Sequence, residues 1–186
     1  LYPGTTERAV AQFKEKGLDL DVAFCPERVA EGVALEEITA LPQIVAGCGE
    51  RAQRRAEELF RCLTPELIPL APLAAELAKL FNNAWRYSQF ALANQFFMMS
   101  NDHGVDFYDV FQAMTYRYPR AAGFPRAGLA AGPCLFKDTM QLAAFNNDHF
   151  PMGQAAMQVN EGFPAYIVAA LERRYGIVFA EYFAAA

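Results

Sequence analysis

The chain has 186 residues, of which 54% are hydrophobic, 13% aromatic and 20% charged, and its formal net charge is −5. This composition predicts a soluble globular protein with a generous core and excludes a disordered chain. No basic stripe is available to neutralise phosphates, so we expect no nucleic-acid partner. No apolar run has the length of a membrane span and no signal-peptide pattern opens the sequence, so we expect no membrane association.

Residues 1–70 alternate between helix and strand patterns, as is typical of an open α/β sheet. Thr5 or Thr6 can cap the first helix, which follows the turn at Pro3-Gly4. The predicted elements are helices over 7–17 and 50–62, strands at 20–26, 42–47 and 67–72, and a loop over 27–32.

From Leu73 onward the pattern is helical. Residues 73–102 contain no Pro or Gly, and their apolar residues recur three or four positions apart, which predicts one long helix with a wide apolar face. Its unusual length indicates packing against a partner, so we expect a homodimer through this helix. The other predicted helices are 106–115 with Asp106 as its cap, 135–145, and 153–176 with an interruption at Gly162 and Pro164.

A loop over residues 117–133 carries three prolines. It is long for a compact domain, which favours a functional role or a lid.

The four cysteines are irregularly spaced, and the chain has only two histidines. None of the cysteines forms a C-x-x-C pair, so we expect no metal site and no disulfide framework. Reduced thiols in a cytoplasmic protein are the simpler interpretation. The cysteines are Cys25, Cys48, Cys62 and Cys134.

Cys134 follows Gly132-Pro133 at the start of a predicted helix. Unpaired N–H groups and the positive end of the helix dipole favour a thiolate there. Lys137 and Asp138 follow three and four residues later. Two interpretations stay open: a buried small hydrophobe or an activated nucleophile.

Glu76, Lys79 and Asn83 share one face of the long predicted helix. Lys79 and Asn83, one turn apart, would present an ammonium and an amide donor to a developing oxyanion. The alternative is a surface stripe with a Glu–Lys pair. A third cluster, Glu27 and Glu31, lies on a loop just after a predicted strand, where α/β proteins place ligands, although a solvated loop would look the same.

In their order and spacing, the segments PERVAEG, AELAKLFNNA and AGPCLFKD resemble the nucleotide-sugar 6-dehydrogenases, the family of UDP-glucose, GDP-mannose and UDP-N-acetyl-hexosamine dehydrogenases. The resemblance runs from about Pro3 to Asn160. It implies a fold that is mainly α with a small α/β N-terminal portion, centred on the helical dimerisation domain of that family. Residues 1–70 would end an NAD-binding domain, 71–158 would be the central domain, and 159–186 would lead to a C-terminal nucleotide-binding domain.

The resemblance also implies an activity. Family members use NAD to oxidise the C6 hydroxyl of a nucleotide-diphosphate sugar to a carboxylate, a four-electron reaction. No G-x-G-x-x-G occurs in this sequence and Leu1 is not a Met, so we expect the cofactor cradle to lie upstream and this chain alone to be inactive.

The matching positions carry specific roles in the family. Cys134 would trap the aldehyde as a thiohemiacetal that is oxidised to a thioester. Lys79 and Asn83 would hold the oxygen on C6, Asp138 would assist proton transfer or position water, and Glu27 would activate the hydrolytic water. Loop 125–131 would lie over the substrate. The remaining implied contacts are Arg28, Val29, Gly128, Gly132 and Arg120 for substrate, and Glu31 and Lys137 near the cofactor or substrate; Arg117 or Arg120 would reach a neighbouring subunit.

Two departures from the family pattern bear on the sugar. Many members have Gly-Gly-Ser-Cys or Gly-Gly-His-Cys where this chain has Ala-Gly-Pro-Cys134, and Arg28-Val29 is typical of N-acetyl-hexosamine members. We therefore expect a UDP-N-acetyl-hexosamine or a related sugar. The alternative function is a helical dimerisation or assembly module with relict site residues; a thiol redox protein would need a resolving cysteine near Cys134.

Overall fold

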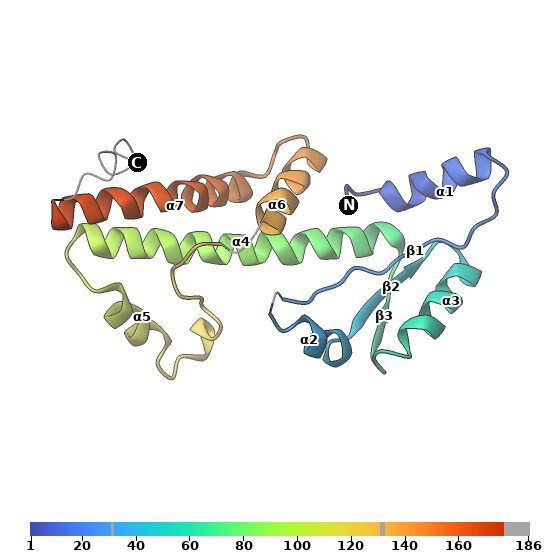
Figure 1. Cartoon of the computed structure of the whole chain (residues 1–186), viewed down its shortest axis with the longest axis horizontal. Coiled ribbons are helices and arrows are strands. Elements are labelled where there is room, and N and C mark those ends of the chain that lie inside the picture. Colours follow the sequence, from blue (N-terminus) through green and yellow to red (C-terminus); the bar gives the residue numbers. More distant parts are fainter. Residues whose placement is uncertain (31, 131–132, 177–186) are drawn as a thin grey trace, which may run out of the picture. The chain divides into compact units, whose positions relative to one another are not determined.

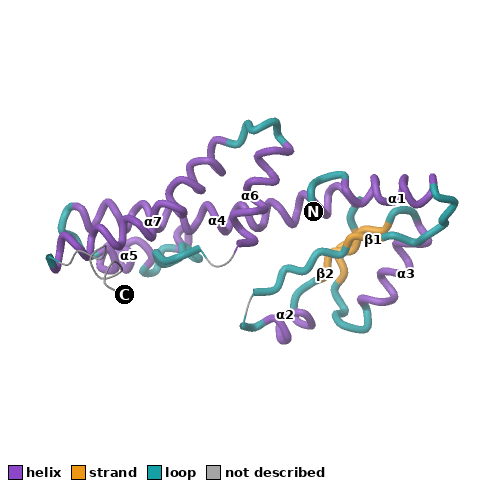
Figure 2. The backbone as a smooth tube through the Cα atoms, turned by 45° about the horizontal axis from the view of Figure 1, so that its top comes forward, coloured by secondary structure: helices purple, strands orange, loops and turns teal. Residues whose placement is uncertain are grey.

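A computed structural model describes residues 1–30, 32–130 and 133–176. The chain divides into two compact units, Leu1–Asn82 and Asn83–Ala186. The first carries the strands and the second is helical (Figures 1 and 2). The expected mainly α chain with a small α/β N-terminal portion is therefore confirmed.

A three-stranded sheet forms the centre of the first unit. Its strands are β1 (Ala23–Phe24), β2 (Gln43–Gly47) and β3 (Leu67–Pro69), in the order β1-β2-β3. β1 pairs antiparallel with β2, and β3 pairs parallel with it, Ile44 standing opposite Ile68. Val45 and Ala46 on the middle strand are fully buried. All three strands lie within the predicted runs.

The helix α3 (Glu50–Phe60) connects the parallel strands β2 and β3. It packs so closely on β2 that a Cβ at Gly47 would lie 2.2 Å from the backbone N of Gln53. Only glycine permits this approach. A further short helix, α2 (Ala34–Ala40), lies where the sequence indicated no element.

Helix α1 (Thr5–Glu15) begins after Gly4, whose φ of 82° is left-handed. The predicted threonine cap is wrong, because neither Thr5 nor Thr6 caps the helix with its side chain. Instead the Glu76 carboxylate accepts hydrogen bonds from the Gly4 N–H (2.5 Å), the Thr6 N–H (2.8 Å) and the Thr6 hydroxyl (2.6 Å). Glu76 belongs to the first part of α4 (Pro72–Asp102).

The second unit contains the rest of α4, followed by α5 (Phe107–Thr115), the 3-10 turn η1 (Pro119–Ala121), α6 (Pro133–Phe145) and α7 (Pro151–Tyr175). Asp106 caps α5 as predicted, its carboxylate accepting from the Tyr108 N–H at 2.8 Å. Aromatic rings pack edge to face around Phe97, which contacts Phe107 and Phe163.

Helix α7 is continuous, so the predicted interruption at Gly162 and Pro164 is wrong. A proline inside a helix removes one N–H donor and crowds the carbonyl four residues earlier. Tertiary contacts outweigh that cost here, because Phe163 and Asn160 are both buried within the unit. The predicted domain boundaries near residues 70 and 158 stay predictions. Among the described residues, no helix is both long and apolar enough to cross a bilayer.

Candidate functional site

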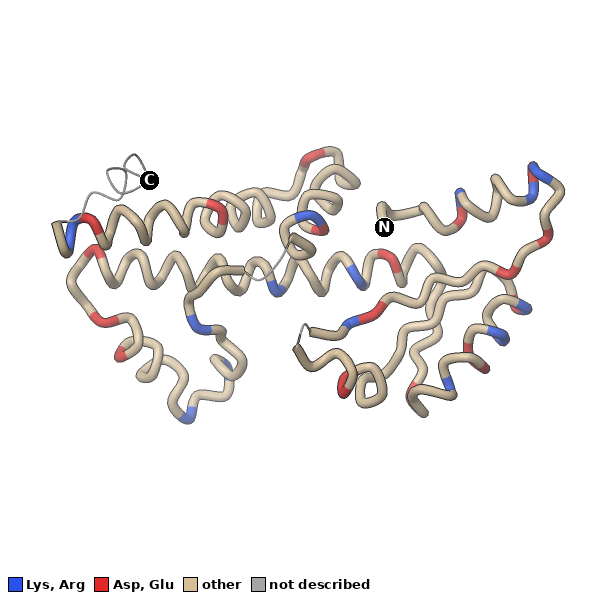
Figure 3. The backbone as a smooth tube through the Cα atoms, viewed as in Figure 1, with Lys and Arg blue, Asp and Glu red and all other residues tan. Residues whose placement is uncertain are grey.

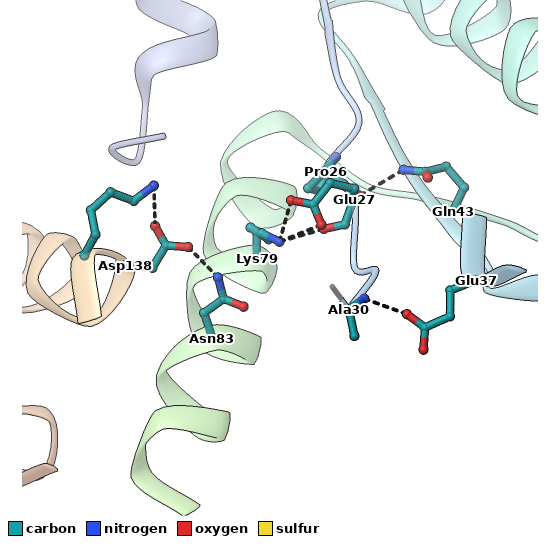
Figure 4. A network of polar contacts seen from close by, with 9 residues as sticks. Pro26, Glu27, Ala30, Glu37, Gln43, Lys79, Asn83 and Asp138 are labelled. Atoms are coloured by element: carbon teal, nitrogen blue, oxygen red, sulfur yellow. Dashed lines mark hydrogen bonds and ion pairs between the residues drawn. The ribbon is translucent and has the colours of Figure 1, made fainter. Parts of the chain in front are cut away.

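The loop after β1 is fastened by polar contacts within the first unit. The Gln43 side chain donates to the Pro26 carbonyl at 3.0 Å, and the Glu37 carboxylate accepts from the Ala30 N–H at 2.6 Å (Figure 4). The Arg28 guanidinium donates to the Pro42 carbonyl. Arg28 thus helps to hold the loop, and Val29 beside it is half-buried; the substrate contacts predicted for both residues stay predictions.

Lys79 is bonded to Glu27, which this loop presents. The Lys79 Nζ lies 2.7 Å from the Glu27 carbonyl oxygen and 3.0 Å from both carboxylate oxygens. The Lys79 side chain is 18% exposed and that of Glu27 is 61% exposed. The long helix thus has no Glu76–Lys79 surface pair, because Glu76 is buried against the start of α1 and Lys79 reaches the loop instead.

A second polar cluster lies within the helical unit. Asn83 of α4 donates through Nδ2 to Asp138 Oδ2 of α6 at 2.5 Å, and the Lys137 Nζ lies 3.3 Å from Asp138 Oδ1 (Figure 4). Asn83 and Asp138 are 6% and 4% exposed. The buried Asp138 carboxylate therefore has an amide donor on one oxygen and an ammonium near the other.

Cys134 is the second residue of α6, one turn before Asp138. Its side chain is exposed, whereas the next residue, Leu135, is buried with Tyr87 and Ala156. The edge of the Phe136 ring also packs against Tyr87, with centroids 6.5 Å apart. The first turn of the helix is therefore fixed by its apolar residues, which leave the thiol facing outward.

The two clusters belong to different units, but α4 carries a member of each. Lys79 and Asn83 are four residues apart and so lie on one face of that helix. The predicted residues of the first unit thus supply an ammonium paired with a carboxylate, and those of the helical unit supply an exposed thiol and a buried amide–carboxylate pair.

Other predicted residues lie apart from these clusters. Gly128 donates its N–H to Asn94 at 2.8 Å. The Arg120 guanidinium stacks 4.4 Å from the Tyr118 ring centroid and donates to its hydroxyl. Glu31 and Gly132 lie outside the described residues.

Several buried polar residues had no predicted role. Within the helical unit, Asn94 donates to Asn160 at 2.9 Å, and Tyr87 donates to Glu161 at 2.6 Å. Burial and the Glu161 carboxylate raise the pKa of Tyr87 far above its ordinary value. Their one signal in the sequence is a polar residue set within an otherwise apolar helical stretch.

The described residues do not fit a dinucleotide cofactor by themselves. The turn Gly47-Cys48-Gly49 between β2 and α3 is the segment most like a phosphate-binding turn, but the space beside Gly47 is filled by the backbone of Gln53. The described part of the chain also holds no group of three or more His, Cys, Asp or Glu placed for a metal ion. A cavity of about 1110 Å³ near Asp102 and Tyr166 is lined by none of the predicted site residues.

Comparison with known proteins gives consistent results. Residues 73–162 match the model described as "UDP-glucose/GDP-mannose dehydrogenase family, central domain". The chain is 31% identical over 170 residues to the UDP-N-acetyl-D-mannosamine dehydrogenase of Pyrococcus horikoshii, covering 88% of this chain and 40% of that protein.

Two solved structures are similar in fold. The UDP-D-ManNAc dehydrogenase of Pyrococcus horikoshii has a TM-score of 0.81 at 30% identity, covering 92% of this chain and 43% of that one. A UDP-glucose dehydrogenase of Pyrobaculum islandicum has a TM-score of 0.78 at 29% identity, covering 95% and 43%. The chain thus spans about two-fifths of the length of the relatives that it matches.

Proposed function

Because residues 73–162 match the central-domain model of the UDP-glucose/GDP-mannose dehydrogenase family, we propose that this chain supplies the nucleophile and the oxygen-binding residues of a nucleotide-sugar 6-dehydrogenase. The observation that carries the proposal is the exposed Cys134 in the first turn of α6, one turn from the buried Asp138–Asn83 pair. The reaction is the oxidation of a C6 hydroxyl to a carboxylate.

The chemistry balances in three stages. The alcohol loses a hydride and a proton to give an aldehyde, and the Cys134 sulfur then adds to that aldehyde carbon to form a thiohemiacetal. Loss of a second hydride and a proton gives a thioester. Water then cleaves the C–S bond and releases the carboxylate and the thiol. Carbon C6 loses four electrons in all, and one water oxygen enters the product.

The chain's own polar residues suit these stages. The Lys79 ammonium and the Asn83 amide donate toward the C6 oxygen as negative charge develops on it. Asp138, buried and bonded to Asn83, accepts a proton or orients the water. Glu27, the more exposed of the two proposed catalytic carboxylates, activates the water that hydrolyses the thioester.

NAD, when bound, accepts the hydride in each oxidation. Since the described residues form no cradle for its diphosphate, this chain alone should produce no NADH from a UDP-sugar and NAD. The chain's own part in the reaction is the formation of the Cys134 thiohemiacetal and the hydrolysis of the thioester.

The segment from α5 to α6 suits a diphosphate. Between Val110 and Lys137 the sequence carries four cations and no Asp or Glu, although the whole chain is acidic (Figure 3). Such a local excess of positive charge attracts phosphates. The cations are Arg117, Arg120, Arg126 and Lys137. We assign Arg120 and Gly128 of this segment to the nucleotide-diphosphate sugar, with Arg117 or Arg120 reaching a neighbouring subunit.

The sugar is proposed to be a UDP-N-acetyl-hexosamine. Arg28-Val29 is the motif that favours it, and the Pyrococcus horikoshii relative is named a UDP-N-acetyl-D-mannosamine dehydrogenase. A UDP-glucose dehydrogenase is structurally almost as similar, so the fold alone does not select the sugar.

A protection experiment tests the covalent step without a cofactor. The 186-residue chain is incubated with the 6-aldehyde of UDP-N-acetyl-mannosamine or of UDP-glucose, and then alkylated with iodoacetamide. We expect the first aldehyde to slow the alkylation of Cys134 by at least about fivefold, through reversible thiohemiacetal formation. Cys62 is also an exposed free thiol, so it is the internal control and should stay unprotected. Equal alkylation of Cys134 with and without aldehyde would contradict the proposal.

The outer face of α4 supports the expected homodimer. Trp85, Leu92 and Met99 are 64%, 49% and 54% exposed and follow one another at intervals of seven residues. Exposed apolar residues at this spacing form a stripe that suits helix pairing. Trp85→Glu should convert a dimer to a monomer in sedimentation at micromolar concentration, whereas Arg86→Glu, on the adjacent exposed position, should not.

The same stripe carries the alternative function, an assembly module with relict site residues. Alkylation rates separate the two. If Cys134 reacts no faster than Cys62 and no aldehyde protects it while the dimer persists, the assembly role is the one that remains.

A further inference from the structure

A buried amide pair joins α4 to α7 next to the loop that leads to Cys134. Asn94 is 0% exposed and Asn160 is 6% exposed. The Asn94 Nδ2 donates to Asn160 Oδ1 at 2.9 Å, and the Asn160 Nδ2 donates to the Tyr87 carbonyl at 2.9 Å. Amides at such depth destabilise a fold unless their hydrogen bonds are made.

The last hydrogen bond in this series reaches Gly128, in the loop that precedes α6. The Asn94 Oδ1 accepts from the Gly128 N–H at 2.8 Å. The backbone groups at the two ends fix the direction of both amides, because the Tyr87 carbonyl can only accept and the Gly128 N–H can only donate. Asn160 therefore sets which atom Asn94 turns toward the loop.

The same loop also packs against the residues that hold the first turn of α6. Ala130 packs against the cluster that contains Tyr87 and Leu135, the residue after Cys134. Gly128 and Ala130 thus hold the loop to the same part of α4 that positions the first turn of α6.

We propose that Asn94 and Asn160 are positioning residues, which fix the loop at residues 125–130 and, through the packing of Ala130 on the cluster of Tyr87 and Leu135, the orientation of the Cys134 thiol. The significance of that thiol rests on the proposed function. The contact itself does not, because the loop is held by this pair whatever chemistry Cys134 performs.

Variants at Asn94 separate loop anchoring from simple helix packing. Asn94→Leu removes both hydrogen bonds and keeps the apolar contacts. Asn101→Leu is the matched control: it lies seven residues further along α4 and also links α4 to α7, through Tyr166 at 2.8 Å, without touching the loop.

Two readouts are measured on the 186-residue chain. Hydrogen exchange at the Gly128 amide reports the loop contact. The rate of iodoacetamide alkylation of Cys134 relative to that of Cys62, in the same molecules, reports the orientation of the Cys134 thiol. Losing one buried hydrogen bond should speed exchange at Gly128 about fivefold to tenfold in Asn94→Leu. Asn101→Leu should stay within about twofold of the parent, and the alkylation ratio of Cys134 to Cys62 should change only in Asn94→Leu.

The proposal is overturned if Asn94→Leu leaves both readouts at parent values, or if Asn101→Leu raises Gly128 exchange as much as Asn94→Leu does. If Asn94→Leu loses its helical circular dichroism, Asn94→Ser replaces it, with the same expectations. Failure of aldehyde protection at Cys134 would remove the proposed function but leave the Gly128 result unchanged, so the two can fail separately.

Discussion

Replacing Glu76 tests whether a buried carboxylate, rather than a threonine cap, fixes the start of α1. Glu76 is 1% exposed and accepts three hydrogen bonds, two of them from Thr6. Hydrogen bonds to charged groups contribute about 1.5–3 kcal/mol each, but the cost of burying the carboxylate offsets part of that sum. Glu76→Ala leaves the two buried Thr6 donors without an acceptor, at a cost of about 1–3 kcal/mol each, so it should destabilise the first unit by about 2–6 kcal/mol.

Glu76→Gln should cost less. Both Thr6 donors bond to Oε1, and a glutamine can keep its single carbonyl oxygen there. Its NH2 group would then face the Gly4 N–H, which is only partly buried and can turn to water. We expect a loss of about 1–2 kcal/mol for this variant.

The assay follows the first unit by its own thiols. Cys25 and Cys48 both lie in that unit and are partly buried, so pulsed alkylation in increasing urea reports its opening. With a urea dependence of about 1 kcal/mol per M for so small a unit, the Glu76→Gln midpoint should fall by about 1–2 M and that of Glu76→Ala by more. Glu58→Ala on the exposed face of α3 is the control. A Glu76→Ala midpoint no lower than that of the control would refute the reasoning.

Three further predictions concern titrating groups. Burial and Glu161 raise the pKa of Tyr87, so the folded chain keeps this phenol protonated at a pH where the unfolded chain ionises it. The stability that results is complete below about pH 10 and is lost as the pH rises further. Tyr87→Phe should diminish this loss in urea titrations at alkaline pH. Hydrogen bonds from Arg51 and Arg55 lower the pKa of Asp21, so its stabilising effect is present above about pH 4 and is lost below it; Asp21→Asn should flatten that acid limb, and 1 M salt should shrink the difference because the pair is exposed. Burial raises the pKa of the Cys25 and Cys48 thiols, so at pH 8 both should be alkylated more slowly than exposed Cys62, as measured by peptide mass spectrometry; equal rates would contradict the burial.

The periodic parts of the sequence predicted the fold well. The long α4 was expected from residue 73 and begins at Pro72, and each strand lies within its apolar run. Apolar spacing reports which face of an element is buried, and this information is local. The antiparallel pairing of β1 with β2 depends on contacts distant in sequence, and no local pattern predicted it.

Polar residues inside helices were the least predictable. In the sequence, Asn94 and Asn160 stand out only as polar residues within apolar helical stretches, and only the packing of α4 against α7 makes them buried partners. Glu76 and Lys79 are three residues apart, a spacing that favours a surface pair, yet each bonds to a different segment. Spacing on one helix states which residues share a face, but not which other element covers that face.

The same limit applies to α7. Judged from the sequence alone, a proline inside a helix costs one hydrogen bond and a clash with the preceding turn, so Pro164 should interrupt the helix. The outcome depended instead on Phe163 and Asn160, whose burial requires α7 to continue in register past the proline. Pro164 has no N–H to donate to the carbonyl four residues earlier, which is that of Asn160. The Asn160 side chain also holds Asn94 toward the Gly128 loop. The proline is therefore tolerated at a place where breaking the helix would also release the contact that we propose orients Cys134.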